Sequence, residues 1–305
     1  MTHVQTEIAS QPDCWARAAK LAGSPGLPAV GERVAVIGCG TSWFMGQAYA
    51  ALRERLGQGE TDAFQASEFP LNRRYDRIIA ITRSGSTTEV VDALGAVRTP
   101  TTVVTADATQ PAAIVADDVI VLDFADEQAV VQTRFATSVL ALLRAGLGQD
   151  IAPIAGDAEV AVRLPLPVRT DTTTQITFLG RGWTVGLAHE AALKCREAAM
   201  VWTEAYPAMD YRHGPISIAA PGRVVWAIGD VPAHLADDVE ATGAAFVHAR
   251  HHGGYGAIGR WCGGRTPLDP MADLIVAQRV AIALAEAQGL DPDHPRNLTR
   301  SVVLQ

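Results

Sequence analysis

Hydrophobic and polar positions follow a repeating order along the first half of the chain: a short apolar run, a small polar loop, then a stretch with helical periodicity. The apolar runs predict strands at 34–38, 77–81, 102–105 and 119–123. The periodic stretches predict helices at 44–57, 87–97 and 131–146. Short apolar strands that alternate with helices indicate βαβ units, and hence a parallel sheet with helices on both faces.

The same order restarts in the second half, after prolines and a threonine run interrupt it around 148–173. Strands are predicted there at 176–180, 224–228 and 245–249, and helices at 186–202 and 272–288. The segments 34–44 and 176–186 both read as strand, Gly-x-Gly and helix, which indicates an internal duplication. The predicted organisation is an N-terminal helical segment (1–30, with a helix at 6–21), a first α/β domain (31–150), a linker (151–171) and a second α/β domain (172–305).

The composition is typical of a folded globular protein and limits the classes of partner that the chain can have. With 305 residues, 48% hydrophobic and 19% charged, the chain has material for two packed cores and is not typical of disorder, collagen or coiled coil. The net charge of −8 disfavours nucleic acid and anionic membranes as partners. Without a signal-like N-terminus or a long apolar stretch, a cytoplasmic protein is expected.

Metal-binding patterns are missing from the sequence. The four cysteines are scattered, and His251 and His252 have no acidic or cysteine ligand at a suitable spacing, so this pair is predicted to be a surface loop. Neither a metal nor a cofactor is predicted.

Two glycine-containing loops carry candidate chemistry. In the first, Gly38 and Gly40 precede Thr41 and Ser42, and the backbone amides and hydroxyls of such a loop suit a phosphate. A dinucleotide fingerprint or a simple tight turn would look similar. The G-x-G-x-x-G pattern is incomplete, however, because Trp43 stands at its third glycine position.

The second loop, residues 82–88, brings five hydroxyls and one guanidinium together around a glycine. One hydroxyl can cap the helix that follows, and the others suit an anion. Both loops follow strands, at the edge where ligands bind in doubly wound sheets. The candidate anion-binding residues are Gly40, Thr41, Ser42, Thr82, Arg83, Ser84, Ser86 and Thr87.

A third candidate is the predicted helix that carries Glu190, Lys194 and Glu197. Their i, i+4, i+7 spacing places them on one helix face, which is also typical of a solvated, salt-bridged surface. A His-Gly-Pro turn at 213–215 follows, and a carboxylate with an imidazole can move protons on a sugar.

These motifs resemble the sugar isomerase (SIS) domain family: GCGTS at 38–42, SEF at 67–69, TRSGST at 82–87, E-x-x-x-K-x-x-E at 190–197, EAY at 204–206 and HGP at 213–215. They resemble most closely the isomerase half of glucosamine-6-phosphate synthases, whose tail is similar to residues 295–302. The resemblance implies two tandem SIS domains, each a flavodoxin-like parallel sheet of five strands flanked by helices, in a homodimer with the sugar site near the subunit interface. The glutaminase half is expected to be absent.

The resemblance also implies residue roles. Ser42, Ser84 and Thr87 match phosphate-binding residues, and Val130 and Thr133 match the segment that lines the sugar site. Glu197 matches the base that moves a proton between C1 and C2, and His213 matches the ring-opening histidine supplied by the other subunit. Glu190 and Lys194 match an acidic–basic pair on the same helix.

One departure changes the expected chemistry. The synthase tail has a lysine that forms a Schiff base with the ketose, and this chain has Arg300 there. Arginine stays protonated and cannot act as an amine nucleophile. Of 25 basic residues only Lys20 and Lys194 are lysines, so imine formation through the tail is not expected. Arg300 could still bind an anion, orient the sugar or close the site.

Three functions remain open. The leading hypothesis is an isomerase or deaminase that removes the C2 proton of a hexosamine 6-phosphate such as glucosamine 6-phosphate. The first alternative is a lyase or dehydratase that eliminates at C3 of N-acetylglucosamine 6-phosphate. The second is a non-catalytic phosphosugar-binding regulator, although residues 1–30 are too short and insufficiently basic for a helix-turn-helix.

Overall fold

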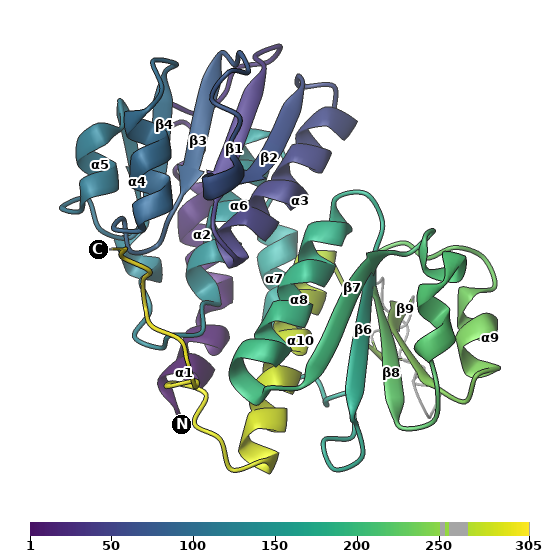
Figure 1. Ribbon diagram of the computed structural model, residues 1–305. Helices are drawn as coiled ribbons and strands as arrows, with labels where there is room; N and C mark the ends of the chain where they lie inside the picture. The colour runs from purple at the N-terminus through teal and green to yellow at the C-terminus, as the bar shows by residue number, and fades with distance from the viewer. Residues whose placement is uncertain (251–253, 256–267, 305) are drawn as a thin grey trace. The chain divides into compact units, whose positions relative to one another are not determined.

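The computed structural model describes residues 1–250, 254–255 and 268–304 (Figure 1). The chain divides into two compact units. The first-sheet unit contains residues 10–152 and 297–305, and the second-sheet unit contains residues 1–9 and 153–296. The N-terminal segment is therefore shared between the units, and the C-terminal tail belongs with the first sheet. The pair His251–His252 lies outside the described residues.

The first-sheet unit is built on five parallel strands in the order β2-β1-β3-β4-β5. They are β1 Val34–Gly38, β2 Thr61–Gln65, β3 Arg77–Ile81, β4 Thr101–Thr105 and β5 Asp118–Val121. This is the flavodoxin-like order. All five residues of β1 and of β4 are buried, as expected for a parallel sheet covered on both faces.

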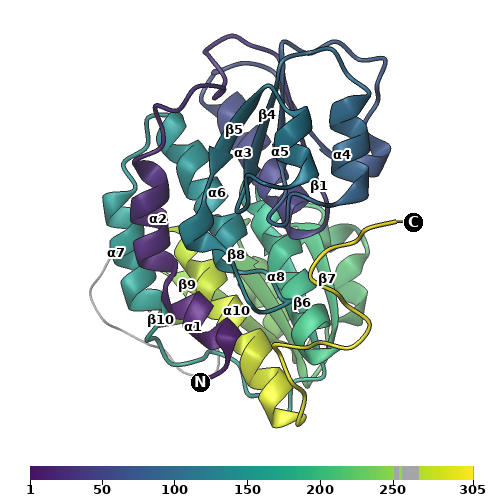
Figure 2. The same ribbon diagram turned by 90° about the vertical axis from the view of Figure 1, so that its left-hand side faces the viewer.

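Helices cover both faces of this sheet (Figures 1 and 2). They are α2 Gln11–Ala19, α3 Thr41–Arg55, α4 Thr88–Gly95, α5 Pro111–Val115 and α6 Arg134–Gly146. Helix α3 packs on β1 and β2 and contacts α6, which in turn packs against α2. On the opposite face, Ala35, Ile37 and Val103 join a core with apolar residues of α4 and α5.

The second-sheet unit has the strand order β10-β9-β8-β6-β7. Its strands are β6 Gln175–Gly180, β7 Trp202–Pro207, β8 Arg223–Ile228, β9 Ala245–Arg250 and β10 Gly254–Tyr255. Four of them are parallel, but β10 has two residues and runs antiparallel to β9. The prediction of a second sheet with five parallel strands is therefore wrong at this edge. The four parallel strands repeat the connectivity of the first sheet, as the predicted duplication requires.

The helices of this unit are α1 His3–Ala9, α7 Ala152–Ala161, α8 Thr184–Ala199, α9 Leu235–Glu240 and α10 Pro270–Ala287. Helices α8 and α10 pack against each other and on the sheet, and α9 contributes to the core of the other face (Figure 1). Helix α7 lies in the segment that was predicted as a linker. No helix in the described ranges is long and apolar enough to cross a bilayer.

Two predicted helix boundaries are corrected. The helix predicted at 6–21 is two helices, α1 and α2, that meet at Ser10. The helix predicted to end at 202 ends at Ala199, because Met200 adopts the left-handed conformation (φ 53°). This turn allows β7 to begin at Trp202.

The turn at Gly85, in the middle of the loop between β3 and α4, generates a stability prediction. Gly85 has φ +65°, and a Cβ there would lie 2.7 Å from Gln110 Cβ and 3.1 Å from Thr105 Oγ1. We expect Gly85→Ala to lower the free energy of unfolding by about 1–3 kcal/mol, measured by urea denaturation.

The matched control is Gly95→Ala in α4, where an added Cβ has nothing within 4 Å. Alanine is the better helix former, so this variant should be unchanged or slightly more stable. Equal stability of the two variants would contradict the steric argument for Gly85.

Candidate functional site

Two loops leave the first sheet side by side. Strands β1 and β3 are neighbours, and Gly38 at the end of β1 pairs in register with Ile81 at the end of β3. The strand order reverses between them, since β2 follows β1 on one side and β4 follows β3 on the other. In open α/β sheets this reversal forms a crevice at the carboxyl ends of the strands, where ligands bind. Both predicted anion loops therefore flank the position that the fold offers to a ligand.

The first loop brings the start of α3 close to the sheet. Gly40 (φ 52°, ψ −123°) precedes the helix, and its carbonyl accepts a hydrogen bond from the Phe44 amide at 3.1 Å. A Cβ at Gly38 would lie 2.8 Å from Ser42 Cβ, so glycine permits this close approach. Thr41 and Ser42 are buried. Burial, together with the Glu89 carboxylate, raises the pKa of the Cys39 thiol to about 11, so the loop carries a neutral thiol at pH 7.

The second loop gathers its hydroxyls before α4. The Gly85 amide donates to Thr82 Oγ1 at 3.2 Å, and the Ser86 amide donates to Ser84 Oγ at 3.3 Å. Thr87 Oγ1 lies 3.4 Å from Thr82 Oγ1 and 3.5 Å from Ser84 Oγ. The predicted hydroxyls are thus brought together, in the hydrogen-bonding range of one another.

The guanidinium of Arg83 has its contacts with Glu127 and with backbone carbonyls rather than with the hydroxyls of the second loop. Its side chain and that of Glu127 are both 0% exposed, with Nη1 3.8 Å from Glu127 Oε2. Nη1 also donates to the Ala129 carbonyl at 3.1 Å. Glu127 Oε1 accepts hydrogen bonds from the Thr133 hydroxyl at 2.9 Å and the Arg134 amide at 2.8 Å. The predicted sugar-lining segment, with Val130 and Thr133, is therefore fixed to Arg83 through Glu127.

The C-terminal tail lies across the second loop, and the yellow segment of Figure 1 ends beside α4. The Arg300 carbonyl accepts from Arg83 Nη2 at 2.7 Å. The Arg300 side chain is 49% exposed and forms an ion pair with Asp126 at 2.6 Å. Sequence reasoning missed Asp126, Glu127 and Ser301. The acidic pair just after the short 3-10 helix Asp123–Ala125, which follows β5, and the hydroxyl next to Arg300 were the available signals.

The residues predicted to carry acid–base chemistry in the second-sheet unit, Glu190, Lys194 and Glu197, lie on α8. Lys194 Nζ is 3.4 Å from Glu190 Oε1 and 2.5 Å from Glu197 Oε2. The side chains of Glu190 and Lys194 are 1% exposed and that of Glu197 is 19% exposed. A solvated, salt-bridged face is therefore the wrong interpretation of this pair. Glu197 is the member of the cluster that keeps access to solvent.

His213 lies at the end of a short 3-10 helix, Tyr211–His213, and is exposed. Its amide donates to the Asp210 carbonyl at 2.8 Å, while its ring makes no hydrogen bond or ion pair with the described residues. The neighbouring Tyr211 is buried, and burial together with Glu204 raises its pKa to about 12. Tyr211 is thus a neutral phenol in the core, and the turn presents His213 outward.

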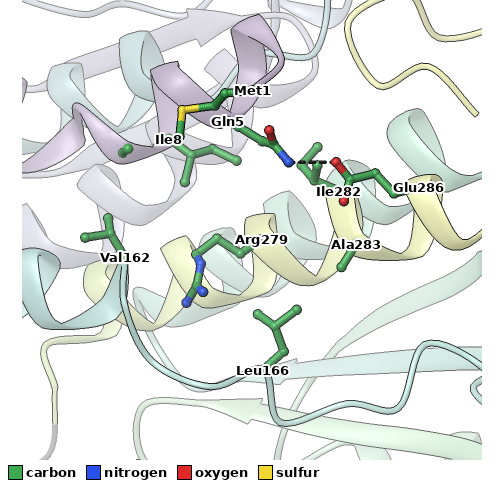
Figure 3. A pocket seen from close by; sticks show the side chains of 10 residues that line it. Met1, Gln5, Ile8, Val162, Leu166, Arg279, Ile282, Ala283 and Glu286 are labelled. Carbon is green, nitrogen blue, oxygen red and sulfur yellow. Dashed lines mark hydrogen bonds between the residues drawn. The ribbon is translucent and has the colours of Figure 1, made fainter.

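A further pocket of about 280 Å³ lies in the second-sheet unit, between α1 and α10 (Figure 3). Apolar side chains such as Ile8, Leu166 and Ile282 line it. Arg279 donates from its guanidinium to the carbonyls of Ala161 and Leu164 at 2.8 and 2.6 Å. None of the predicted site residues lines this pocket.

Known proteins that are similar to this chain agree with the resemblance seen in its motifs. No protein-family model matches the chain. The chain is similar to glutamine–fructose-6-phosphate aminotransferases (isomerizing), with 30% identity over 316 residues in Symbiobacterium thermophilum and 27% over 297 residues in Sulfolobus acidocaldarius. Both alignments cover 90% of this chain, and 52% and 50% of the relatives, respectively. The chain therefore spans about half the length of these relatives.

Solved structures share the fold over almost the whole chain. Glucosamine-6-phosphate deaminase from Thermotoga maritima matches with TM-score 0.79 and 23% identity, covering 99% of this chain and 100% of that one. The C-terminal domain of glucosamine-fructose-6-phosphate aminotransferase from Francisella tularensis matches with TM-score 0.78 and 19% identity, covering 97% and 99%. Together with the sequence relatives, these matches confirm the resemblance predicted from the motifs.

The buried pair of Arg83 and Glu127 generates a second stability prediction. Removing one partner leaves the other charge buried and uncompensated, so Glu127→Gln should lower the free energy of unfolding by about 3 kcal/mol or more. The control is Arg300→Gln, which removes the exposed pair with Asp126 and should cost less than about 1 kcal/mol. Both losses are measured by chemical denaturation followed by circular dichroism. Equal losses would show that the buried pair of Arg83 and Glu127 matters no more for stability than the exposed pair of Arg300 and Asp126.

Proposed function

We propose that this chain, which resembles the isomerase half of glucosamine-6-phosphate synthases, acts on hexosamine 6-phosphates by removing the C2 proton, as an isomerase or deaminase. The observation that carries the proposal is the ion-paired cluster on α8. Lys194 is held between two carboxylates, and Glu197 keeps access to solvent. An ion-paired ammonium group has no free electron pair for imine formation, whereas an accessible carboxylate can accept a proton.

The chemistry proposed for Glu197 needs only the substrate and water. The open-chain aldose loses its C2 proton to the carboxylate, and the electron pair forms a C1–C2 double bond as the C1 oxygen takes a proton. Return of a proton to C1 gives the 2-imine of the ketose when C2 carries an amine. Addition of water to that imine releases ammonia and leaves fructose 6-phosphate. The tail lysine that the resemblance associates with imine formation has no part in these steps.

Phosphate recognition in this proposal comes from the first-sheet unit. Ser42, Ser84 and Thr87 would bind the phosphate, with Gly40, Thr41, Thr82 and Ser86 completing the two loops. Val130 and Thr133 would line the sugar site, and Arg300 would orient the sugar or close the site. Hydroxyls and backbone amides at the start of helices are suited to a phosphate dianion. Names of relatives and fold neighbours, which refer to fructose 6-phosphate and glucosamine 6-phosphate, support the same substrate class.

The activity test uses purified protein with glucosamine 6-phosphate and, separately, N-acetylglucosamine 6-phosphate. Ammonia, fructose 6-phosphate and an ultraviolet-absorbing enal are read independently. We expect ammonia and fructose 6-phosphate from the first substrate, and a fall in kcat of at least about 100-fold in Glu197→Gln, the loss typical of a general base.

The control for that substitution is Glu240→Gln, an exposed carboxylate on α9, which should keep full activity. Enal from the N-acetylated sugar would replace the proposal with C3 elimination. If no product forms while Glu197→Gln binds the sugar phosphates as tightly as the wild type, the protein is a binding regulator and the catalytic proposal is wrong.

The proposed active form is a homodimer in which His213 opens the sugar ring in the partner's site. The outward position of His213 supports this arrangement. We expect Glu197→Gln and His213→Asn to be nearly inactive alone. Mixed under conditions that allow subunit exchange, they should regain about a quarter of wild-type activity, since each mixed two-fold dimer keeps one intact site. Activity that stays at the sum of the two parents would place His213 in its own subunit's site.

A further inference from the structure

The main chain of the C-terminal tail is anchored to the second loop by hydrogen bonds that do not involve the Ser301 hydroxyl. Arg83 Nη2 donates to the Arg300 carbonyl at 2.7 Å. The Thr88 amide donates to the Val302 carbonyl at 3.3 Å, and the Leu304 amide donates to Thr88 Oγ1 at 2.9 Å. These bonds lie on both sides of residue 301, so they fix its position along the loop.

The anchor at Arg83 is rigid because the guanidinium is fully buried. Its charge faces Glu127 at 3.8 Å, and its Nη1 donates to the Ala129 carbonyl at 3.1 Å. A buried charge that is held from two sides has little freedom to move, and hydrogen bonds from charged donors are stronger than neutral ones. Arg83 is therefore suited to hold the tail rather than to reach a ligand among the hydroxyls.

The Ser301 hydroxyl joins those of the second loop. Its Oγ lies 3.1 Å from Ser84 Oγ and 3.0 Å from Ser86 Oγ. Each hydroxyl has a single proton and rotates to suit its partners. Without an anion the three hydroxyls can bond to one another, and with an anion beside them they can turn their protons toward it. Ser301 thus adds a donor to the loop from a segment distant in sequence.

We propose that Ser301 is a further phosphate-binding residue and that Arg83 is the positioning residue that places it, through the Arg300 carbonyl. The inference rests on the proposed function, because it assigns a ligand to the same phosphate. It gives Arg83 a different part from the one predicted from sequence, where it was a direct phosphate ligand. It also gives the tail a use that does not depend on a lysine.

The binding test is isothermal titration calorimetry with glucosamine 6-phosphate, in a Glu197→Gln background that prevents turnover. Adding Ser301→Ala should weaken the affinity about tenfold, the effect of losing one hydrogen bond to a charged group. Ser301→Thr, which keeps the hydroxyl, should restore most of it. The control is Val303→Ala, a tail residue that is 62% exposed and should leave the affinity unchanged.

The positioning part is tested by a double-mutant cycle in the same background. Arg83→Gln should weaken binding about as much as Ser301→Ala, and the two together should be no weaker than either alone, because they act on one contact. A merely structural effect of Arg83 would add to the loss at Ser301. Arg83→Lys, which keeps the charge opposite Glu127, separates loss of folding from loss of the tail contact.

The outcomes separate the inference from the proposed function. If neither the Glu197→Gln parent nor wild type binds the sugar phosphate, both fail. If Ser84→Ala weakens binding while Ser301→Ala behaves like Val303→Ala, the proposed function stands and the inference is wrong. If Ser301→Ala binds more tightly, the tail competes with phosphate, which also overturns the inference.

Discussion

The buried charge of Arg83 is the constraint on which the first-sheet unit's candidate site depends. A guanidinium with no exposure must be compensated, and Glu127 and two carbonyl groups do this. The partners come from the segment after β5 and from the tail, while Arg83 itself follows β3. One charge therefore connects three segments at the carboxyl edge of the sheet: the second loop, the segment after β5 and the C-terminal tail. These contacts fix the shape of the second loop.

The second-sheet unit also contains a buried charge, that of Lys194. Lys194 is as buried as Arg83, but its partners Glu190 and Glu197 lie on the same helix, so the cluster organises one helix face rather than several segments. The cost of burying the ammonium is offset by two carboxylates. Only Glu197 retains solvent access, which is the condition for a group that must exchange protons with a substrate. The scarcity of lysine in the sequence and the ion pairing of Lys194 both argue against amine chemistry.

How far the sequence predicts the structure depends on the range of the contacts involved. Strands β1 and β3 were predicted because their apolar runs are continuous, and the loops after them because hydroxyls cluster there. Strands β2 and β7 were missed, since both are partly exposed edge strands with polar residues. Ser301 was missed because its partner lies 217 residues away, and no local pattern reports such a contact. Glu127 was missed for the same reason: its ion pair with Arg83 exists only in the folded unit.

The most direct test of the central claim is hydrogen exchange at C2 of glucosamine 6-phosphate in deuterium oxide, followed by proton NMR of the recovered sugar. We expect the wild type to replace the C2 proton with deuterium, and Glu197→Gln to slow this exchange by at least about 100-fold. Exchange at an undiminished rate in Glu197→Gln, or its absence in a wild type that forms product, would contradict proton abstraction by Glu197.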